Sequence, residues 1–143
     1  MTGRLQDRIA LITGAGSVGP GWGNGRATCV RFAEEGAKIF AADRNLDSVA
    51  ETVAKVKVVG GEIVTHQCDV TDNTSVAAMV KACVKHYGRI DVLVNNVGGS
   101  AHGGPVEMSE EVWDAQVDFN LKSVFLTCKH VLPVMEKQKR GAI

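Results

Sequence analysis

Several features that would assign a chain to a specialised class are absent from these 143 residues. No apolar run approaches the roughly 20 residues needed to cross a bilayer, and the segment from Met1 to Asp7 has no hydrophobic signal core. Sixteen basic residues balance sixteen acidic ones, so there is no basic field of the kind that binds nucleic acid or anionic lipid. These absences predict a cytoplasmic protein with neither nucleic-acid nor membrane partners.

Cysteine is also sparse. The four cysteines are far apart in the sequence and form no C-x-x-C pair. They are Cys29, Cys68, Cys83 and Cys128. A disulfide framework is typical of smaller, cysteine-dense secreted chains, and a zinc site needs clustered cysteine and histidine ligands. We therefore expect four reduced thiols and no metal site.

The sequence instead shows a regular alternation of apolar runs and amphipathic segments. Short runs rich in β-formers predict strands at residues 8–13, 38–42, 63–67 and 90–94. Helical periodicity predicts helices over 25–35, 46–59, 76–87 and 109–139, the last with Pro133 as a kink or break. This order, without hairpin signals, favours parallel strands joined by helical crossovers. We predict an α/β fold, a doubly wound parallel sheet of about four strands, in one domain over residues 1–143.

A glycine cluster follows the first predicted strand, where doubly wound sheets bind their ligands. Gly14, Gly16 and Gly19 match the G-x-G-x-x-G dinucleotide pattern literally, but Pro20 argues against a helix that begins at Gly19. Glycines at this position permit a tight turn and a close backbone approach to a diphosphate at a helix N-terminus. The loop is therefore a candidate dinucleotide site.

An acidic residue at the end of the second predicted strand strengthens this interpretation. Asp43 can accept hydrogen bonds from both hydroxyls of an adenosine ribose and would repel a 2′-phosphate, which favours NAD over NADP. The adjacent Arg44 leaves NADP open, because an arginine there can hold that phosphate.

The ordered motifs resemble those of the short-chain dehydrogenase/reductase family. Its opening pattern T-G-x-x-x-G-x-G is matched by residues 13–17 and 23–27, with residues 18–22 as a five-residue insert. In that register the motif glycines are Gly14, Gly23 and Gly25, and the resemblance adds Gly16, Ser17 and Asn24 to the cofactor-binding residues. The insert should alter the loop over the diphosphate, where Trp22 either covers the cofactor or simply packs.

Three later segments resemble family motifs in the same order. Cys68-Asp69-Val70 implies that Asp69 accepts from the adenine amino group while Val70 packs on the ring. Asn95-Asn96-Val97-Gly98 is similar to the N-N-A-G motif, which implies that Asn95 stabilises the sheet and that Asn96, Val97 and Gly98 contact the cofactor. Phe119-Asn120-Leu121 resembles the segment with the family's catalytic asparagine, so Asn120 is expected to support a water in a proton relay.

The residues that move the proton in this family have no counterpart in the chain. They are a serine and a Y-x-x-x-K pair, whereas the single tyrosine here is Tyr87 and the residue four later is Asp91. The last residues, 141–143, resemble the start of the family's fifth strand, so the fourth strand is expected to have an unpaired edge. The resemblance thus implies the cofactor-binding half of an NAD(P)-dependent oxidoreductase, inactive by itself, for a small alcohol or carbonyl substrate.

Two alternatives stay open. The chain is a non-catalytic dinucleotide-binding or interaction module if the absence of Y-x-x-x-K is taken literally. A flavodoxin-like module would bind a mononucleotide instead, although Asp43 and the N-N-V-G segment speak against it. For the full-length protein, the resemblance implies a homo-oligomer, a dimer or tetramer.

Overall fold

The computed structural model describes residues 3–143 and shows a four-stranded parallel sheet in the order β3-β2-β1-β4. The strands are β1 (Ile9–Thr13), β2 (Lys38–Asp43), β3 (Ile63–Gln67) and β4 (Val92–Val94). The helices are α1 (Asn24–Glu34), α2 (Ala50–Val58), α3 (Asn73–Tyr87), α4 (Glu110–Val117) and α5 (Ser123–Gln138). A 3-10 segment, η1 (Leu46–Val49), precedes α2, and a π-helical segment, η2 (Asp118–Lys122), joins α4 to α5. The predicted α/β fold class is confirmed.

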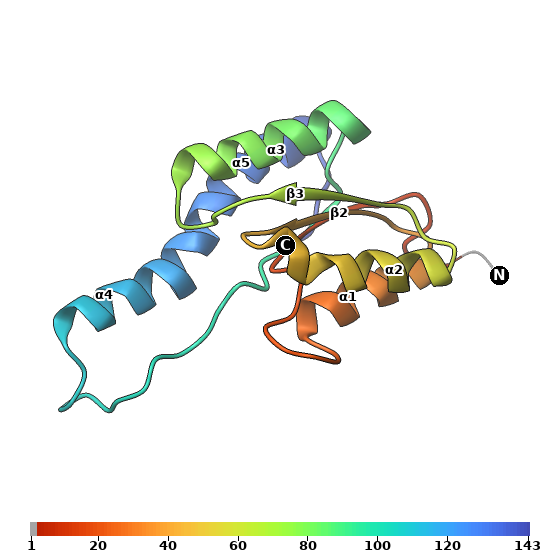
Figure 1. Ribbon diagram of the computed structural model, residues 1–143. Helices are drawn as coiled ribbons and strands as arrows, with labels where there is room; N and C mark the ends of the chain where they lie inside the picture. The colour runs from red at the N-terminus through yellow and green to blue at the C-terminus, as the bar shows by residue number, and fades with distance from the viewer. Residues whose placement is uncertain (1–2) are drawn as a thin grey trace.

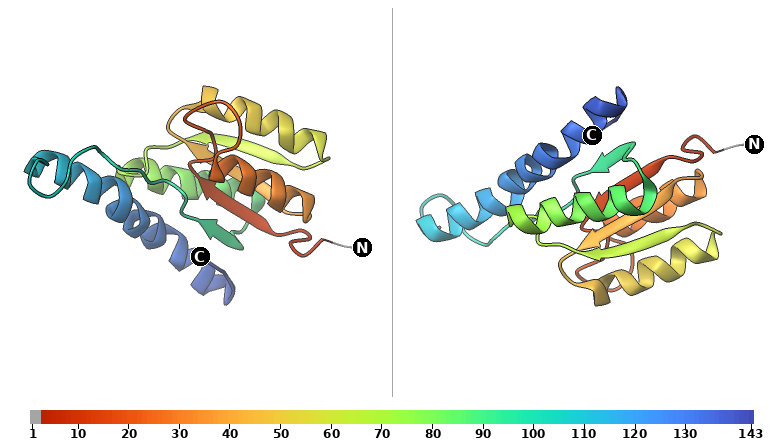
Figure 2. Two further views of the ribbon diagram at one scale, coloured as in Figure 1. Left: turned by 90° about the horizontal axis from the view of Figure 1, so that it is seen from below. Right: turned by 90° about the horizontal axis from the view of Figure 1, so that it is seen from above.

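Helices cover both faces of the sheet, α1 and α2 on one side and α3 and α5 on the other (Figures 1 and 2). Successive strand residues point to opposite faces, so β1 contributes to two cores. Ile9 and Leu11 pack with α3 and α5, whereas Ala10 and Ile12 pack with α1 and α2. Burial on both faces explains why the strand segments read as continuous apolar runs.

The free edge of β4 is partly paired, which corrects the expectation of an unpaired strand. The Leu93 amide donates to the Ala142 carbonyl at 3.0 Å, and the Ala142 amide donates to the Asp91 carbonyl at 3.0 Å. Ala142 lies parallel to Val92 in this bridge. Residues after α5 therefore return to the sheet and begin a parallel pairing beside β4.

Pro133 lies inside α5 and does not break it. The helical stretch begins as predicted, with the Ser109 hydroxyl accepting from the Val112 amide at 3.4 Å. Its irregularity is η2, ten or so residues before the proline, where the backbone widens into π geometry. Such segments are rare and are frequently found at functional sites.

The α4 and α5 helices expose several large apolar side chains. None of the α4 residues, all of which the structure describes, is buried. The exposed side chains recur mostly four residues apart along the two helices: Trp113, Val117, Leu121, Phe125 and Leu132. We call this set the apolar stripe. Within residues 3–143, no helix is long and apolar enough to cross a membrane.

Candidate functional site

A cleft of about 510 Å³ lies at the carboxyl ends of the strands. Its walls include every residue that the sequence predicted to bind a cofactor. These are Gly14, Gly16, Ser17, Gly23, Asn24, Gly25, Asp43, Arg44, Asp69, Val70, Asn96, Val97 and Gly98. The parallel sheet explains this convergence, because it brings the loops after all four strands to one edge.

The start of α1 packs directly on the end of β1. A Cβ on Gly25 would lie 1.8 Å from the Gly14 carbonyl oxygen and 2.7 Å from the Asn96 side-chain nitrogen, so only glycine fits. Gly14 has a φ of +62°, which glycine adopts without strain. By contrast, a Cβ on Gly19 would meet no heavy atom of the described residues within 4 Å. Gly25, the last motif glycine of the register with an insert, is therefore closely packed, whereas Gly19, the last glycine of the literal pattern, is not.

The N-terminus of α1 suits an anionic group. The N-cap is Gly23, which has no side chain to satisfy the first amides, and the first turn contains no acidic residue. Both Gly23 and Gly25 line the cleft. Unsatisfied amides and the positive end of the helix dipole favour a phosphate at such a position.

The carboxylate of Asp43 is held in place at the end of β2. One oxygen accepts from the Gly16 amide and the other from the Asn45 amide, each at 3.0 Å. A carboxylate can accept about four hydrogen bonds, so each oxygen retains capacity for a ligand hydroxyl. The side chain is half-buried in the cleft wall, and its two backbone bonds fix its orientation.

Asp69 lies in the cleft wall after β3. Its Oδ1 accepts from the Thr71 hydroxyl at 2.7 Å and from the Thr71 amide at 2.9 Å. These hydrogen bonds hold the pKa of Asp69 below its usual range, and the positive charge of Arg44 lowers it further. Asp69 is thus ionised at neutral pH and is a hydrogen-bond acceptor only.

The two asparagines after β4 tie neighbouring elements together. The Asn96 side-chain nitrogen donates to the Gly14 carbonyl at 2.9 Å, and the Asn96 backbone amide donates to the Thr13 hydroxyl at 3.3 Å. The Asn95 oxygen accepts from the Thr127 hydroxyl of α5 at 2.6 Å. Asn96 therefore fixes the glycine turn against β4, and Asn95 connects the sheet to a helix.

Asn120 lies outside the cleft wall, although its neighbour Phe119 is part of that wall. Its side-chain oxygen accepts from the Gly99 amide at 3.0 Å, and its nitrogen donates to the Gly99 carbonyl at 2.9 Å. The same nitrogen also donates to the Gln116 carbonyl at 2.9 Å. In the structure Asn120 joins η2 to the loop after β4, and its role in a proton relay stays a prediction.

Tyr87 packs against β2 and is not part of the cleft wall. Its ring contacts Phe40 edge to face at a centroid distance of 6.5 Å, and its hydroxyl donates to the Ile39 carbonyl at 3.4 Å. Burial raises the pKa of Tyr87. A proton-transferring tyrosine needs the opposite shift, so Tyr87 does not substitute for the family's catalytic residue.

Sequence reasoning missed Arg26, which is only 3% exposed behind the glycine loop. Its guanidinium donates to the Thr52 hydroxyl and to the Ser48 carbonyl, each at 3.3 Å. Sequence reasoning also missed Ser48, which lines the cleft. The one signal in the sequence is a charged residue directly after the last glycine of the motif, and it does not indicate the partners.

Comparison with known proteins agrees with the geometry. The model of the short chain dehydrogenase family matches residues 8–143. The 3-oxoacyl-(acyl-carrier-protein) reductase FabG from Thermotoga maritima is 40% identical over 140 residues, which are 98% of this chain and 55% of that protein. The crystal structure of a short-chain dehydrogenase/reductase from Burkholderia xenovorans superposes with a TM-score of 0.97 at 55% identity, covering 99% of this chain and 54% of the other.

Related structures contain either cofactor. NAD+-bound xylitol dehydrogenase is 32% identical with a TM-score of 0.88, covering 96% of this chain and 52% of that one. A metagenomic short-chain oxidoreductase in complex with NADP is also 32% identical, with a TM-score of 0.87 and coverage of 96% and 60%. The chain therefore spans about half the length of the relatives it matches. It belongs to the short-chain dehydrogenase/reductase family and aligns with about half the length of the NAD(P)-dependent oxidoreductases that it matches.

Proposed function

We propose that this chain is the cofactor-binding part of an NAD-preferring oxidoreductase that acts on a small alcohol or carbonyl compound. The observation that carries the proposal is the convergence in one cleft of an uncapped helix N-terminus, two fixed carboxylates and the N-N-V-G segment. Each group suits a different part of a dinucleotide, and each follows a different strand of the sheet, whose order is β3-β2-β1-β4. When bound, the cofactor supplies the hydride chemistry.

Residues of the cleft wall match the diphosphate, the ribose and the adenine of a dinucleotide in turn. Gly23 and Gly25 would hold the diphosphate, because the amides at the α1 N-terminus are free to donate to it. Neither residue has a side chain that would occupy the space of the ligand. Asp43 would accept the ribose hydroxyls, and Asp69 would accept from the adenine amino group. Val70 and Val97 supply apolar wall on which an adenine ring can pack.

The preference for NAD follows from charge at the ribose. Asp43 is held by two backbone amides and cannot easily turn away, so a 2′-phosphate would meet a fixed negative charge. Arg44 also lines the cleft, but it is exposed and lies near enough to Asp69 to lower the pKa of that carboxyl. Its charge is therefore partly compensated, and we propose NADP as the weaker cofactor.

Proton transfer requires groups beyond those of this chain. The family's serine and Y-x-x-x-K pair have no counterpart in these 143 residues, so the chain by itself is expected to bind cofactor without turnover. Asn120 would contribute to the relay from η2 in the whole enzyme. The apolar stripe supports the further proposal that the protein forms a homo-oligomer, since contiguous exposed apolar surface marks an interaction site.

The decisive experiment compares NAD and NADP binding in the wild type and in Asp43→Asn. Removing the charge should raise the Kd of NAD about tenfold, which corresponds to the loss of one charged hydrogen bond. The ratio of the Kd of NADP to the Kd of NAD should fall. Asp47→Asn is the matched control, because Asp47 is exposed in η1 and is not part of the cleft wall.

Equal NAD affinity in the wild type and in Asp43→Asn would contradict the ribose assignment. A wild-type protein that binds neither cofactor would overturn the proposed function. Binding of NAD without turnover by the whole protein, across a panel of small alcohols and carbonyls, would instead favour the non-catalytic module.

A further inference from the structure

Residues 18–22 form an excursion whose two ends meet. A Cβ on Gly23 would lie 3.2 Å from the Ser17 hydroxyl oxygen, so the residues on either side of the insert are in contact. The chain leaves the glycine turn at Ser17 and returns at Gly23 without moving α1 away from β1. This explains how Gly25 still packs on Gly14 despite five extra residues.

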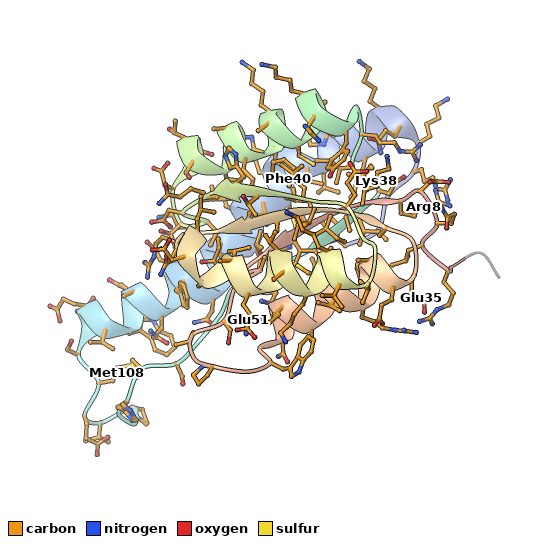
Figure 3. The ribbon with its side chains drawn as sticks, turned by 45° about the vertical axis from the view of Figure 1, so that its right-hand side comes forward. Arg8, Glu35, Lys38, Phe40, Glu51 and Met108 are labelled. Carbon is orange, nitrogen blue, oxygen red and sulfur yellow. The ribbon has the colours of Figure 1, made fainter. Side chains whose placement is uncertain are left out.

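One end of the excursion is attached to the η1–α2 segment through Arg26. The buried guanidinium donates to the Gly21 carbonyl and forms an ion pair with Glu51 at 2.6 Å. Glu51 lies on the side of α2 that faces the glycine loop (Figure 3). Arg26 thus holds the returning end of the insert against α2.

The same network reaches the other end of the glycine loop. The Thr52 hydroxyl accepts from Arg26 at 3.3 Å and donates to the Ala15 carbonyl at 2.9 Å. Arg26 also donates to the Ser48 carbonyl, and a Cβ on Gly16 would clash with the Ser48 hydroxyl at 2.0 Å. Both ends of the loop are therefore held by one segment of about five residues.

Trp22 adds a second attachment on α2. The Lys55 ammonium lies 4.7 Å from the centroid of the Trp22 ring, and it also pairs with Glu51 at 3.4 Å. Trp22 is 62% exposed and is not part of the cleft wall. The expectation that Trp22 itself covers the diphosphate is therefore not supported, because its ring lies against a helix.

The insert presents Val18 to the cleft instead. Val18 lines the cleft, and its side chain is fully exposed. The Ser17 hydroxyl donates to the Gly19 carbonyl at 2.8 Å, which curves the chain at this point. An apolar side chain in open solvent at the mouth of a cleft gains burial when a ligand fills the space beneath it.

We propose that residues 18–22 are a cover for the cofactor diphosphate, with Arg26, Trp22 and Lys55 as positioning residues that anchor it on α2. The proposal rests on the proposed function, because it assumes that the cleft holds a dinucleotide. Val18 directly follows Ser17, whose hydroxyl oxygen would lie 3.2 Å from a Cβ on Gly23, the N-cap of α1, where the diphosphate is expected. The cover therefore acts on ligands that have a diphosphate.

The test compares ADP, AMP and NAD as ligands of the purified protein. ADP and NAD have the diphosphate that the cover would contact, whereas AMP has a single phosphate. Trp22→Ala and Lys55→Ala each remove the contact between the Trp22 ring and the Lys55 ammonium, and both side chains lie at the surface of the molecule. The matched control is Lys57→Ala, an exposed lysine two residues further along α2.

Trp22→Ala and Lys55→Ala should each raise the Kd of ADP and of NAD about five- to tenfold, while the Kd of AMP changes less than about twofold. Arg26→Lys keeps the charge beside Glu51 but loses the simultaneous bonds to two carbonyls, so it should follow the same pattern. Lys57→Ala should match the wild type for all three ligands. A merely structural effect would weaken ADP and AMP equally and lower the unfolding midpoint.

Two results would overturn the cover. One is wild-type affinity for ADP and NAD in Trp22→Ala and Lys55→Ala, and the other is an equal loss for ADP and AMP. In either case the wild type still binds NAD, so the proposed function stands. Failure of the wild type to bind ADP, AMP and NAD would overturn the proposed function, and the cover with it.

Discussion

The sheet with its glycine loop and the apolar stripe of α4 and α5 differ greatly in how far their side chains are buried. In β1 and β2 the core residues Leu11, Ile12 and Ile39 have no exposed surface. In the second region Trp113, Leu121 and Phe125 are each at least 60% exposed. Figure 1 shows α4 projecting away from the sheet, with a long loop connecting it to β4.

This difference separates two roles within one chain. The sheet region buries its apolar side chains internally, and it also positions every residue of the cleft wall except Phe119. The apolar stripe has no cover in the structure of residues 3–143, and it is the surface that we propose for contact with another copy. Stability and cofactor binding should therefore depend on the first region, and association on the second.

Replacing one phenylalanine in each region tests this comparison with the largest expected effect. Phe40→Ala removes a ring that is 2% exposed and should lower the free energy of unfolding by about 3–5 kcal/mol. Phe125→Ala removes a ring that is 60% exposed and should change it by only about 0.5 kcal/mol at protein concentrations where the chain is monomeric. Urea titration followed by circular dichroism measures both values.

Sedimentation velocity of the same two variants completes the comparison. Phe125→Ala should weaken self-association, while any folded Phe40→Ala should associate as the wild type does. A large loss of monomer stability in Phe125→Ala, or unchanged association, would remove the distinction between the two regions.

Glycine substitutions give the next largest effect. Gly25→Ala places a methyl group 1.8 Å from the Gly14 carbonyl oxygen, which should cost about 1–3 kcal/mol and abolish NAD binding. The control is Gly104→Ala in the loop before α4, where the added methyl group meets only the end of the flexible Glu107 side chain. Calorimetry should show NAD binding in the control alone, and binding by Gly25→Ala would contradict the close packing of α1 on β1.

The smallest effect concerns two buried thiols of the first region. Burial raises the pKa of Cys29 and of Cys83 from 9.0 to about 12. Folding therefore favours the protonated thiols, and their contribution is complete below pH 9 and declines as the pH rises toward 12. As the pH rises from 9 to 10, each thiol should lower the free energy of unfolding by about 1 kcal/mol.

Cys29→Ala and Cys83→Ala isolate this contribution from that of other titrating groups. The pH dependence of urea unfolding should be shallower in each variant than in the wild type. Identical slopes in all three proteins would mean that these thiols are more accessible to water than the structure shows.

Much of the sheet region was predictable because its signals are local. The third predicted strand coincides with β3, and Gly88 ends α3 in the left-handed conformation, directly after the predicted end of that helix. Periodicity and turn chemistry act over a few residues, so they can be seen without any tertiary structure. The meeting of the predicted cofactor-binding residues in one cleft was also predictable, since the loops after parallel strands lie at one edge of the sheet. Their role in cofactor binding stays a prediction.

The contacts that act across the chain were not predictable in this way. Ala142 pairs with β4, Asn120 binds the loop at Gly99, and Trp22 lies under Lys55. In each case the partner is set by how two elements pack together. The sequence contains several residues of the same type that could have made the same contact.

The sequence by itself determined the alternation of strands and helices, the glycine turn and the acidic residue at the end of β2, because each depends on neighbouring residues. Only the tertiary structure decided which glycines are in close contact, how Arg26 anchors the insert and where the apolar stripe is exposed. Those outcomes depend on the packing of elements distant in sequence, for which residue spacing carries no signal.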